Sequence, residues 1–256
     1  MTHIAAEFKP ILAQIGFNAR DAFTNPAIKP WRKLPDRENC VWDLDIPGRG
    51  ATRLHIKRFT PHPSAKDPAR LEAAGYRALR RHGIPTADVV AWGRHNMRGF
   101  IITRDLSGFR PVDKLIEAGA AFEQFLIPTA ELAAKLHGAG LHHRDLYLCH
   151  FLARRGEKEN VDLRLLDAAR VRPLPGPLTR RRWLVKDLAQ FRYSTLALPI
   201  SEAQRDRWLE HYASRTRIAR LDTLRKSIAR KCDTITAHDK KLRVSQPGRH
   251  VSIPEL

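Results

Sequence analysis

The chain of 256 residues has no run of 18 or more apolar residues, so no transmembrane helix is expected. Its first residues, Met1 to Phe8, lack a basic segment followed by an apolar core, and no signal peptide is expected. Cysteine is scarce: Cys40, Cys149 and Cys232 are widely spaced and form no CxxC pair. This spacing argues against structural zinc and predicts a reducing, cytoplasmic setting.

Acidic residues are also few, at 27 against 46 lysines and arginines, for a formal net charge of +19. Such a field attracts nucleic acid, anionic lipid or phosphorylated sugars, and charge alone does not choose among them or exclude a merely solvated basic surface. Since the chain has no aromatic RNA-stacking motif, a nucleic-acid partner is not expected. A hydrophobic content of 43% excludes global disorder.

Hydrophobic periodicity divides the chain into a strand-rich part and a helix-rich part. The first 35 residues predict a short helix from apolar positions between Ile4 and Ile15, followed by a loop that prolines interrupt. Alternating polarity then predicts a hairpin over 39–60, a helix over 69–82, and strands at 89–92 and 99–103. The later segments predict helices within 111–138, a strand over 161–166, and helices over 183–197 and 201–213.

This order predicts an α+β chain of two lobes. The expected divisions are an N-terminal extension (1–35), a small β-rich N-lobe (36–104), a larger helical C-lobe (105–214), and a basic C-terminal helix and tail (215–256).

Two residues in the first lobe are suited to binding nucleotide phosphates. Lys57 ends the alternating segment Leu54-His55-Ile56-Lys57, which is typical of the strand lysine that contacts the α and β phosphates in kinases. Glu72 is the only acid between Ala69 and His82, near the start of the next helix, where it could fix the lysine ammonium. Taken alone, each could equally be a solvated side chain.

The segment from His143 to Phe151, HRDLYLCHF, is typical of a kinase catalytic loop. Asp145 is its candidate catalytic residue, because a carboxylate there accepts a hydrogen bond from the substrate hydroxyl and orients it. His150 stands where protein kinases place a metal-binding asparagine. It could bind the metal weakly, act through water, or hold Asp145, and imidazole suits Mn²⁺ better than Mg²⁺.

Two further carboxylates follow the loop. Asp167 comes directly after an apolar strand, 22 residues beyond Asp145, and is the expected Mg²⁺ ligand, with a loop-capping role as the alternative. Asp187 is expected either to hold the catalytic-loop backbone from a buried position or to serve as an acid at a helix N-terminus.

The sequence signals for binding the nucleotide base, and for a loop that covers the phosphates, are weaker. The segment Gly99–Gly108, which includes Asp105, predicts an interlobe connection whose backbone contacts adenine. A Gly-rich phosphate loop is missing before Lys57, where Gly48 and Gly50 lie in a short hairpin turn and do not make GxGxxG.

Together these residues resemble the lipopolysaccharide core kinases, the Kdo and heptose (WaaP-type) kinases of Gram-negative bacteria. The match is strongest in HRDLYLCHFL, where histidine stands five residues after the aspartate as in that family. It extends to the stretch that ends in Gly83-Ile84-Pro85, to Leu166-Asp167, and to Val185-Lys186-Asp187-Leu188-Ala189 with Ser194. Ala168-Ala169 departs from typical members.

The resemblance implies a protein-kinase-like fold and ATP-dependent phosphorylation of a sugar hydroxyl, Kdo or heptose, in the lipopolysaccharide inner core. It implies ATP and Mg²⁺ as cofactors, with Mn²⁺ as an alternative metal, and a place at the cytoplasmic face of the inner membrane. Lys57, Glu72, Asp145 and Asp167 carry over as phosphate lysine, its partner, catalytic aspartate and metal ligand. Other small-molecule or protein kinases, or a basic pseudokinase or binding protein, stay open as alternatives.

The tail predicts an amphipathic helix. Six residues at steps of three or four form one apolar stripe, among cationic side chains: Ile218, Leu221, Leu224, Ile228, Cys232 and Ile235. Such a helix could lie on an anionic membrane surface, or its stripe could pack on the large lobe while its basic face is solvated.

Overall fold

The computed structural model describes residues 2–46, 50–61, 67–155 and 160–245. The chain divides into two compact units. The first contains residues 1–78 and 86–107, and the second contains residues 79–85 and 108–256. No helix in the described ranges is long and apolar enough to cross a membrane.

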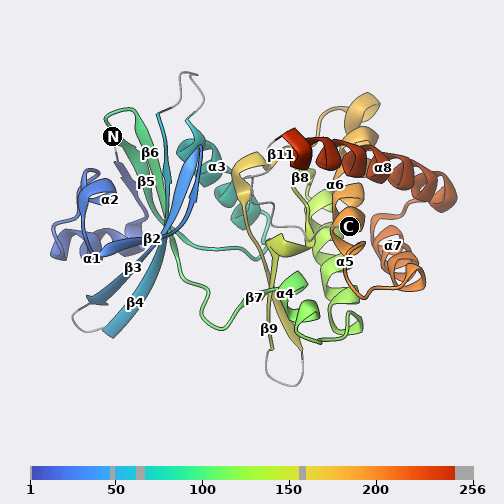
Figure 1. The fold of residues 1–256 in the computed structure, drawn as a ribbon, viewed down its shortest axis with the longest axis horizontal. Helices are drawn as coiled ribbons and strands as arrows, with labels where there is room; N and C mark the ends of the chain where they lie inside the picture. The colour runs from blue at the N-terminus through green and yellow to red at the C-terminus, as the bar shows by residue number, and fades with distance from the viewer. Residues whose placement is uncertain (1, 47–49, 62–66, 156–159, 246–256) are drawn as a thin grey trace. The chain divides into compact units, whose positions relative to one another are not determined.

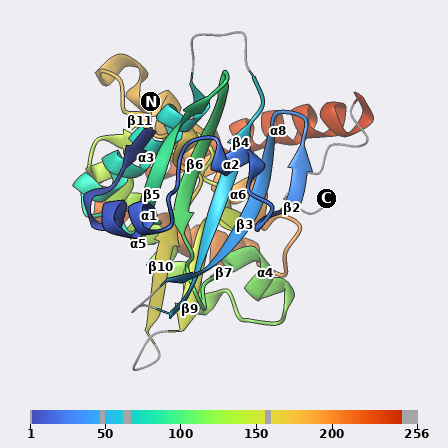
Figure 2. The same cartoon turned by 90° about the vertical axis from the view of Figure 1, so that its left-hand side faces the viewer.

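The first unit is built on a six-stranded antiparallel sheet with the strand order β1-β5-β6-β4-β3-β2 (Figure 2). The predicted hairpin is confirmed as β3 and β4, paired from Arg37↔Phe59 to Ile46↔Gly50. Its turn, including Gly48, lies outside the described residues. The strands are β1 (Thr2–Ile4), β2 (Ile28–Leu34), β3 (Arg37–Ile46), β4 (Gly50–Phe59), β5 (Val89–His95) and β6 (Arg98–Arg104).

The prediction for the first 35 residues was wrong in part. Thr2–Ile4 is a strand at one edge of the sheet, and Ile28–Leu34 is a strand at the other edge. The sequence predicts a loop at Pro30. An edge strand tolerates a proline, because the missing N–H need not cost an inter-strand hydrogen bond. The strand register shifts next to Pro30. Helix is confined to η1 (Ala6–Phe8), α1 (Lys9–Gln14) and α2 (Asp21–Thr24).

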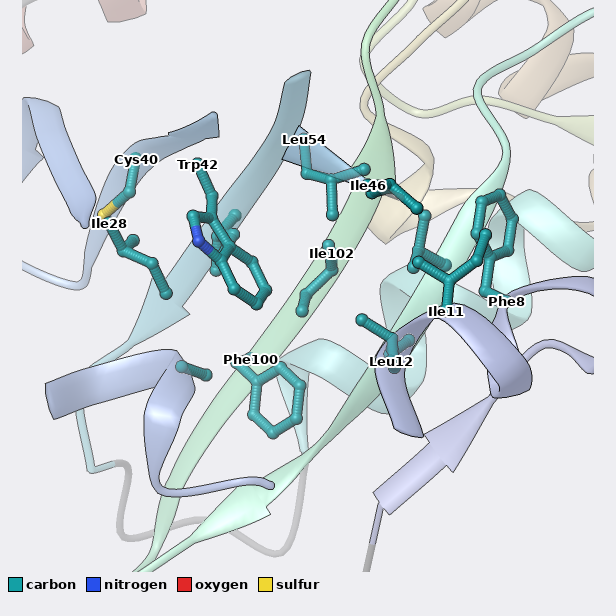
Figure 3. Packing of buried hydrophobic residues seen from close by; sticks show 14 residues of the cluster. Phe8, Ile11, Leu12, Ile28, Cys40, Trp42, Ile46, Leu54, Phe100 and Ile102 are labelled. Carbon is teal, nitrogen blue, oxygen red and sulfur yellow. The ribbon is translucent and has the colours of Figure 1, made fainter. Parts of the chain in front are cut away.

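One face of this sheet forms the hydrophobic core of the unit with α1 (Figure 3). Ile11 and Leu12 of α1 pack with Trp42, Leu54 and Ile102 of the strands. Because side chains alternate along a strand, the residue after Ile56 projects from the opposite face. That residue is Lys57, which is paired in register with Ile101.

Helix α3 (Pro68–Arg81) confirms the helix predicted over 69–82. Asp67 begins it, because its Oδ1 accepts hydrogen bonds from the amides of Ala69 and Arg70 at 3.1 and 3.2 Å. Gly99 of β6 lets this end of the helix approach, since a Cβ there would lie 3.2 Å from the Cβ of Ala69. The first turn of α3, and with it Glu72, is therefore held close to the sheet.

The second unit is mainly helical, with α5 packed on α7 and α6 on α8 (Figure 1). Its helices are α4 (Val112–Glu117), α5 (Glu123–Gly138), α6 (Pro177–Thr195), α7 (Glu202–Thr216) and α8 (Leu221–Ser245), with short 3-10 turns η2 (Leu148–His150) and η4 (Ala168–Arg170). Its strands are β7 (Arg110–Pro111), β8 (Leu141–His142), β9 (Phe151–Arg155), β10 (Val161–Leu165) and β11 (Arg172–Pro173). The α+β prediction is confirmed.

Two helix predictions need correction. Helix α6 begins at Pro177, six residues before the predicted start, because proline is well tolerated in the first turn of a helix. Asp187 consequently lies within the helix and is not at its N-terminus. The tail helix α8 begins at Leu221, so Ile218 precedes it.

The apolar stripe of α8 is packed inside the second unit. Leu224, Ile228 and Cys232 are each 5% exposed or less, and α8 packs along α6. Of the two arrangements predicted for the tail helix, on a membrane surface or packed on the large lobe, the structure shows the apolar stripe packed on the protein.

Candidate active site

Lys57 and Glu72 form an ion pair in the first unit. Lys57 Nζ donates a hydrogen bond of 2.6 Å to Glu72 Oε1, which joins β4 to α3. The glutamate side chain is 2% exposed and the lysine side chain 25%, so the pair keeps part of the ammonium accessible. The predicted interaction between Lys57 and Glu72, the only acid in the helix body, is therefore present.

Asp105, the predicted adenine-segment residue, follows β6 and pairs with a histidine. Its Oδ1 lies 2.6 Å from Nε2 of His55, and its amide donates to the carbonyl oxygen of Arg53 at 3.1 Å. The pairing ties the exit of β6 to the neighbouring strand β4. The side chain of Asp105 is thus used for holding this exit in place.

Asp187 holds the start of the catalytic loop in the second unit. Its Oδ2 accepts a hydrogen bond of 2.6 Å from the amide of His143, and its Oδ1 accepts one of 2.8 Å from the amide of Arg144. Nε2 of His137 in α5 lies 3.3 Å from Oδ2. The carboxylate is fully buried, and the expected role of holding the loop backbone is confirmed by these contacts.

The ionised form of Asp187 is favoured by this environment. Burial on its own raises the pKa of the carboxyl group, but the hydrogen bond and charge of His137, followed by His143, lower it below its usual value. By contrast, burial lowers the pKa of the His143 imidazole, so that ring is neutral. A buried carboxylate with two amide donors is the arrangement that keeps a charge stable in a protein interior.

Helix α6 contributes two more anchors from the same face. Ser194 Oγ accepts a hydrogen bond of 2.8 Å from the amide of Leu148. Gln190 Nε2 donates one of 3.1 Å to the hydroxyl of Tyr147. Together with Asp187 these side chains follow helical spacing, so a single face of α6 lies along the whole loop.

The loop backbone is strained at Arg144, whose amide donates a hydrogen bond to Asp187. Arg144 has φ +70°, in the left-handed region that non-glycine residues rarely adopt. Its guanidinium lies 4.6 Å from the ring centroid of Trp183 in α6, a cation–π contact that contributes to holding this conformation. The strain falls on the residue immediately before Asp145, as is common at functional sites.

Asp145, the predicted catalytic residue, pairs with an arginine. Nη1 of Arg170, in η4, donates a hydrogen bond of 2.9 Å to Asp145 Oδ1. The aspartate side chain is 22% exposed and the arginine side chain 59%, so both can be reached from solvent. Sequence reasoning did not identify Arg170, because its only signal was a position three residues after Asp167.

His150 joins the loop to Asp167. Its Nδ1 lies 2.7 Å from the carbonyl oxygen of Asp145, and its Nε2 lies 3.5 Å from Oδ2 of Asp167. Burial lowers the pKa of His150, but Cys149, Asp167 and the Asp145 carbonyl raise it by more, to about 10. A protonated ring can donate from both nitrogens, which matches its two oxygen partners.

Asp167 itself has a left-handed backbone, with φ +59° and ψ +59°, at the exit of β10. The structure thus brings Asp145, His150, Asp167 and Asp187 together around one loop. Among the described residues, no group of three or more histidine, cysteine, aspartate or glutamate side chains could hold a metal ion without further ligands. One or two carboxylates together with substrate phosphates are, however, a usual set for Mg²⁺.

Comparison with known proteins places the chain in a family. A model of the lipopolysaccharide kinase (Kdo/WaaP) family matches residues 48–212. A lipopolysaccharide core heptose(I) kinase WaaP of Pseudomonas aeruginosa is 27% identical over 229 residues, which are 78% of this chain and 83% of that protein. The kinase of the same name from Escherichia coli is 31% identical over 147 residues, which are 51% of this chain and 53% of the relative.

These matches confirm the family resemblance, the kinase-like fold and the predicted phosphotransferase activity on a sugar of lipopolysaccharide. The kinase family also implies the use of ATP.

Proposed function

We propose that this chain, which belongs to the lipopolysaccharide kinase family, transfers the γ-phosphoryl group of ATP to a heptose hydroxyl of the lipopolysaccharide inner core. Heptose is the acceptor in the printed names of the relatives, one of which spans 78% of this chain. The observation that carries the proposal is the anchored loop, in which Asp187 holds two consecutive amides directly before Asp145.

In this proposal, Asp145 accepts a hydrogen bond from the sugar hydroxyl and orients its oxygen toward the γ-phosphorus. Phosphoryl transfer needs little covalent help from the protein, so positioning and charge stabilisation account for most of the rate. Arg170, which donates a hydrogen bond to the same carboxylate, holds Asp145 in place. The loop anchors on α6 keep that geometry from shifting during the reaction.

Lys57 is the proposed ligand of the α and β phosphates, held by Glu72. Asp167 is the proposed carboxylate for Mg²⁺, which when bound neutralises charge on the β and γ phosphates. Since His150 already contacts two oxygens, we assign it the role of holding Asp145 and Asp167. Asp105 is proposed to hold the adenine-binding segment through His55 rather than to contact the base.

We place the protein at the cytoplasmic face of the inner membrane, where lipopolysaccharide core sugars would be accessible to ATP. Because the apolar stripe of α8 is buried, any attraction to anionic lipid would come from cationic side chains on its exposed face, such as Lys226 and Arg230. Deleting the tail after Ser214 would uncover part of the core, so charge substitution is the cleaner test of this attraction.

Mass spectrometry of core oligosaccharide from cells with and without the gene tests the function. One phosphate should be missing from a heptose in the deletion strain, and the wild-type gene should restore it. Complementation with Asp145→Asn should not restore it. A phosphate lost from Kdo would move the acceptor assignment to that sugar, and an unchanged core together with phosphorylation of generic proteins would contradict the proposal.

A further inference from the structure

A basic groove lies on the second unit between the first half of α6 and the middle of α8. Its volume is about 560 Å³, within the range of sites that bind small molecules. From α6 it is lined by a helical face at steps of three and four that includes Leu178, Arg182 and Lys186. From α8 it is lined by Ser227 and Lys231, one turn apart.

The charged side chains described in the lining of the groove are all positive. No carboxylate is among the described residues that line it. The four cationic side chains that line it are Arg181, Arg182, Lys186 and Lys231. In other parts of this unit arginines are matched by acids, as when Arg225 pairs with both Asp206 and Asp222. An unmatched row of cations around a hollow is suited to a ligand with several negative charges.

The groove also has a flat apolar surface. Trp183 lies within it, half-buried, with Lys186 Nζ 5.5 Å from its ring centroid. Leu178, at the N-terminal end of the same face, is fully exposed. A groove with an aromatic ring and several cations offers both stacking and charge to one ligand.

The groove lies beside the loop that carries Asp145. Lys186 is close enough to Asp145, Arg144 and Arg170 for their charges to affect its titration, although burial is the main cause of its lowered pKa. Arg144, the residue before Asp145, stacks on Trp183 of the groove. A ligand in the groove would therefore lie beside the residue that precedes the proposed catalytic aspartate.

We infer that this groove binds the anionic part of the acceptor glycan, the carboxylate- or phosphate-bearing sugars that flank the hydroxyl to be phosphorylated. The inference rests on the proposed function, since it deepens the choice of acceptor at the same site. The ligand is a glycan and not a lipid surface, because the cations line a hollow beside the loop that carries Asp145. Arg182 and Lys231 bind its charges from opposite helices.

The test is the binding of deacylated core oligosaccharide to the full-length protein, measured by isothermal titration calorimetry without ATP. The double variant Arg182→Ala/Lys231→Ala should bind at least about tenfold more weakly than wild type, because two charge-assisted contacts are lost. In steady-state assays the same variant should raise the KM for oligosaccharide, with the KM for ATP within about twofold.

A matched control is Lys240→Ala/Lys241→Ala, which removes two exposed charges from the same helix outside the groove and should bind like wild type. With oligosaccharide that has been dephosphorylated and carboxyl-reduced, the groove variant and wild type should bind alike. Equal affinity of the groove variant and wild type for the charged oligosaccharide, or no binding by wild type, would overturn the inference.

Two further outcomes are distinguishable. If wild type binds the charged oligosaccharide through the groove but transfers no phosphate to it, the proposed function fails and the groove assignment stands. If the groove variant loses binding to phosphatidylglycerol vesicles but keeps wild-type affinity for oligosaccharide, the groove is a lipid contact and the inference is wrong.

Discussion

Arg170 donates a hydrogen bond of 2.9 Å to Asp145, across 25 residues of sequence. The two side chains come from different parts of the second unit, since Asp145 lies in the loop before η2 and Arg170 lies in η4. In the proposed mechanism, the second oxygen of the carboxylate accepts the hydrogen bond from the substrate hydroxyl. The mechanism therefore assigns different tasks to the two oxygens of one carboxylate.

Replacing Arg170 should slow catalysis with little effect on stability. We expect Arg170→Ala to lower kcat by about tenfold, because Asp145 loses its orienting charge, and to change the free energy of unfolding by less than about 1 kcal/mol, since the pair is exposed. Arg170→Lys should restore part of the activity. Steady-state kinetics and urea unfolding measure both quantities, and wild-type kcat in Arg170→Ala would contradict the orienting role.

Asp145→Ala and Asp167→Ala should each lower kcat by a factor of about 10² or more while the fold stays intact, as monitored by circular dichroism. Both side chains are partly exposed, so neither substitution removes a fully buried group. Wild-type turnover in either variant would remove that residue from the proposed mechanism.

Asp187→Asn should destabilise the second unit. One amide donor of the loop would face an NH₂ group in place of an oxygen, and the expected loss is about 2–4 kcal/mol of unfolding free energy. The matched control is Asp222→Asn, whose side chain is 87% exposed and which should change stability by less than about 0.5 kcal/mol. Equal urea midpoints for the two variants would show that the buried hydrogen bonds contribute little.

His142 should make stability depend on pH. Burial lowers its pKa from 6.5 to about 4, and the residue is 3% exposed. Between these values the unfolded chain binds more protons than the folded one, so the free energy of unfolding falls as the pH falls from 6.5 toward 4. The full contribution is about 3 kcal/mol.

His142→Phe keeps a ring beside Trp183 and should flatten this part of the pH profile, measured by urea unfolding at several pH values. His238→Phe, at an exposed position of α8, is the control and should keep the wild-type slope. Identical slopes for His142→Phe and wild type would show that other groups cause the loss.

His150→Asn should change the preference between Mg²⁺ and Mn²⁺ more than it changes affinity for ATP. The substitution removes an imidazole next to Asp167 and introduces an amide oxygen that Mg²⁺ accepts as a ligand. Activity titrations with each metal, alongside ATP binding, measure the two effects. Unchanged metal profiles would mean that His150 serves only the backbone of the loop.

The sequence predicted the parts of the site that depend on short-range patterns. Alternation along β4 identified Lys57 as a strand lysine, and Glu72 was identified as the only acid of the next helix that could fix it. The segment from His143 to His150 identified the loop. Each of these signals spans about ten residues or fewer, which is why it could be identified without knowledge of the fold.

The parts that were missed depend on long-range pairing. Thr2–Ile4 is a strand only because β5 is available as a partner, and its three residues carry no pattern of their own. Arg170 and Gln190 belong to the loop only through tertiary contacts. The sequence likewise could not show that the apolar stripe of α8 is buried. An amphipathic helix that packs on protein and one that lies on lipid have the same spacing of apolar residues.

The hold of Asp187 on the His143 and Arg144 amides also has a consequence for synthesis on the ribosome. The chain emerges from its N-terminus, so the loop leaves the ribosome more than 40 residues before the carboxylate that anchors it. Until α6 docks, the strained backbone at Arg144 has nothing to hold it. A nascent chain that ends before Asp187 lacks the carboxylate that holds these two amides, so the loop can take its described conformation only after α6 has been made.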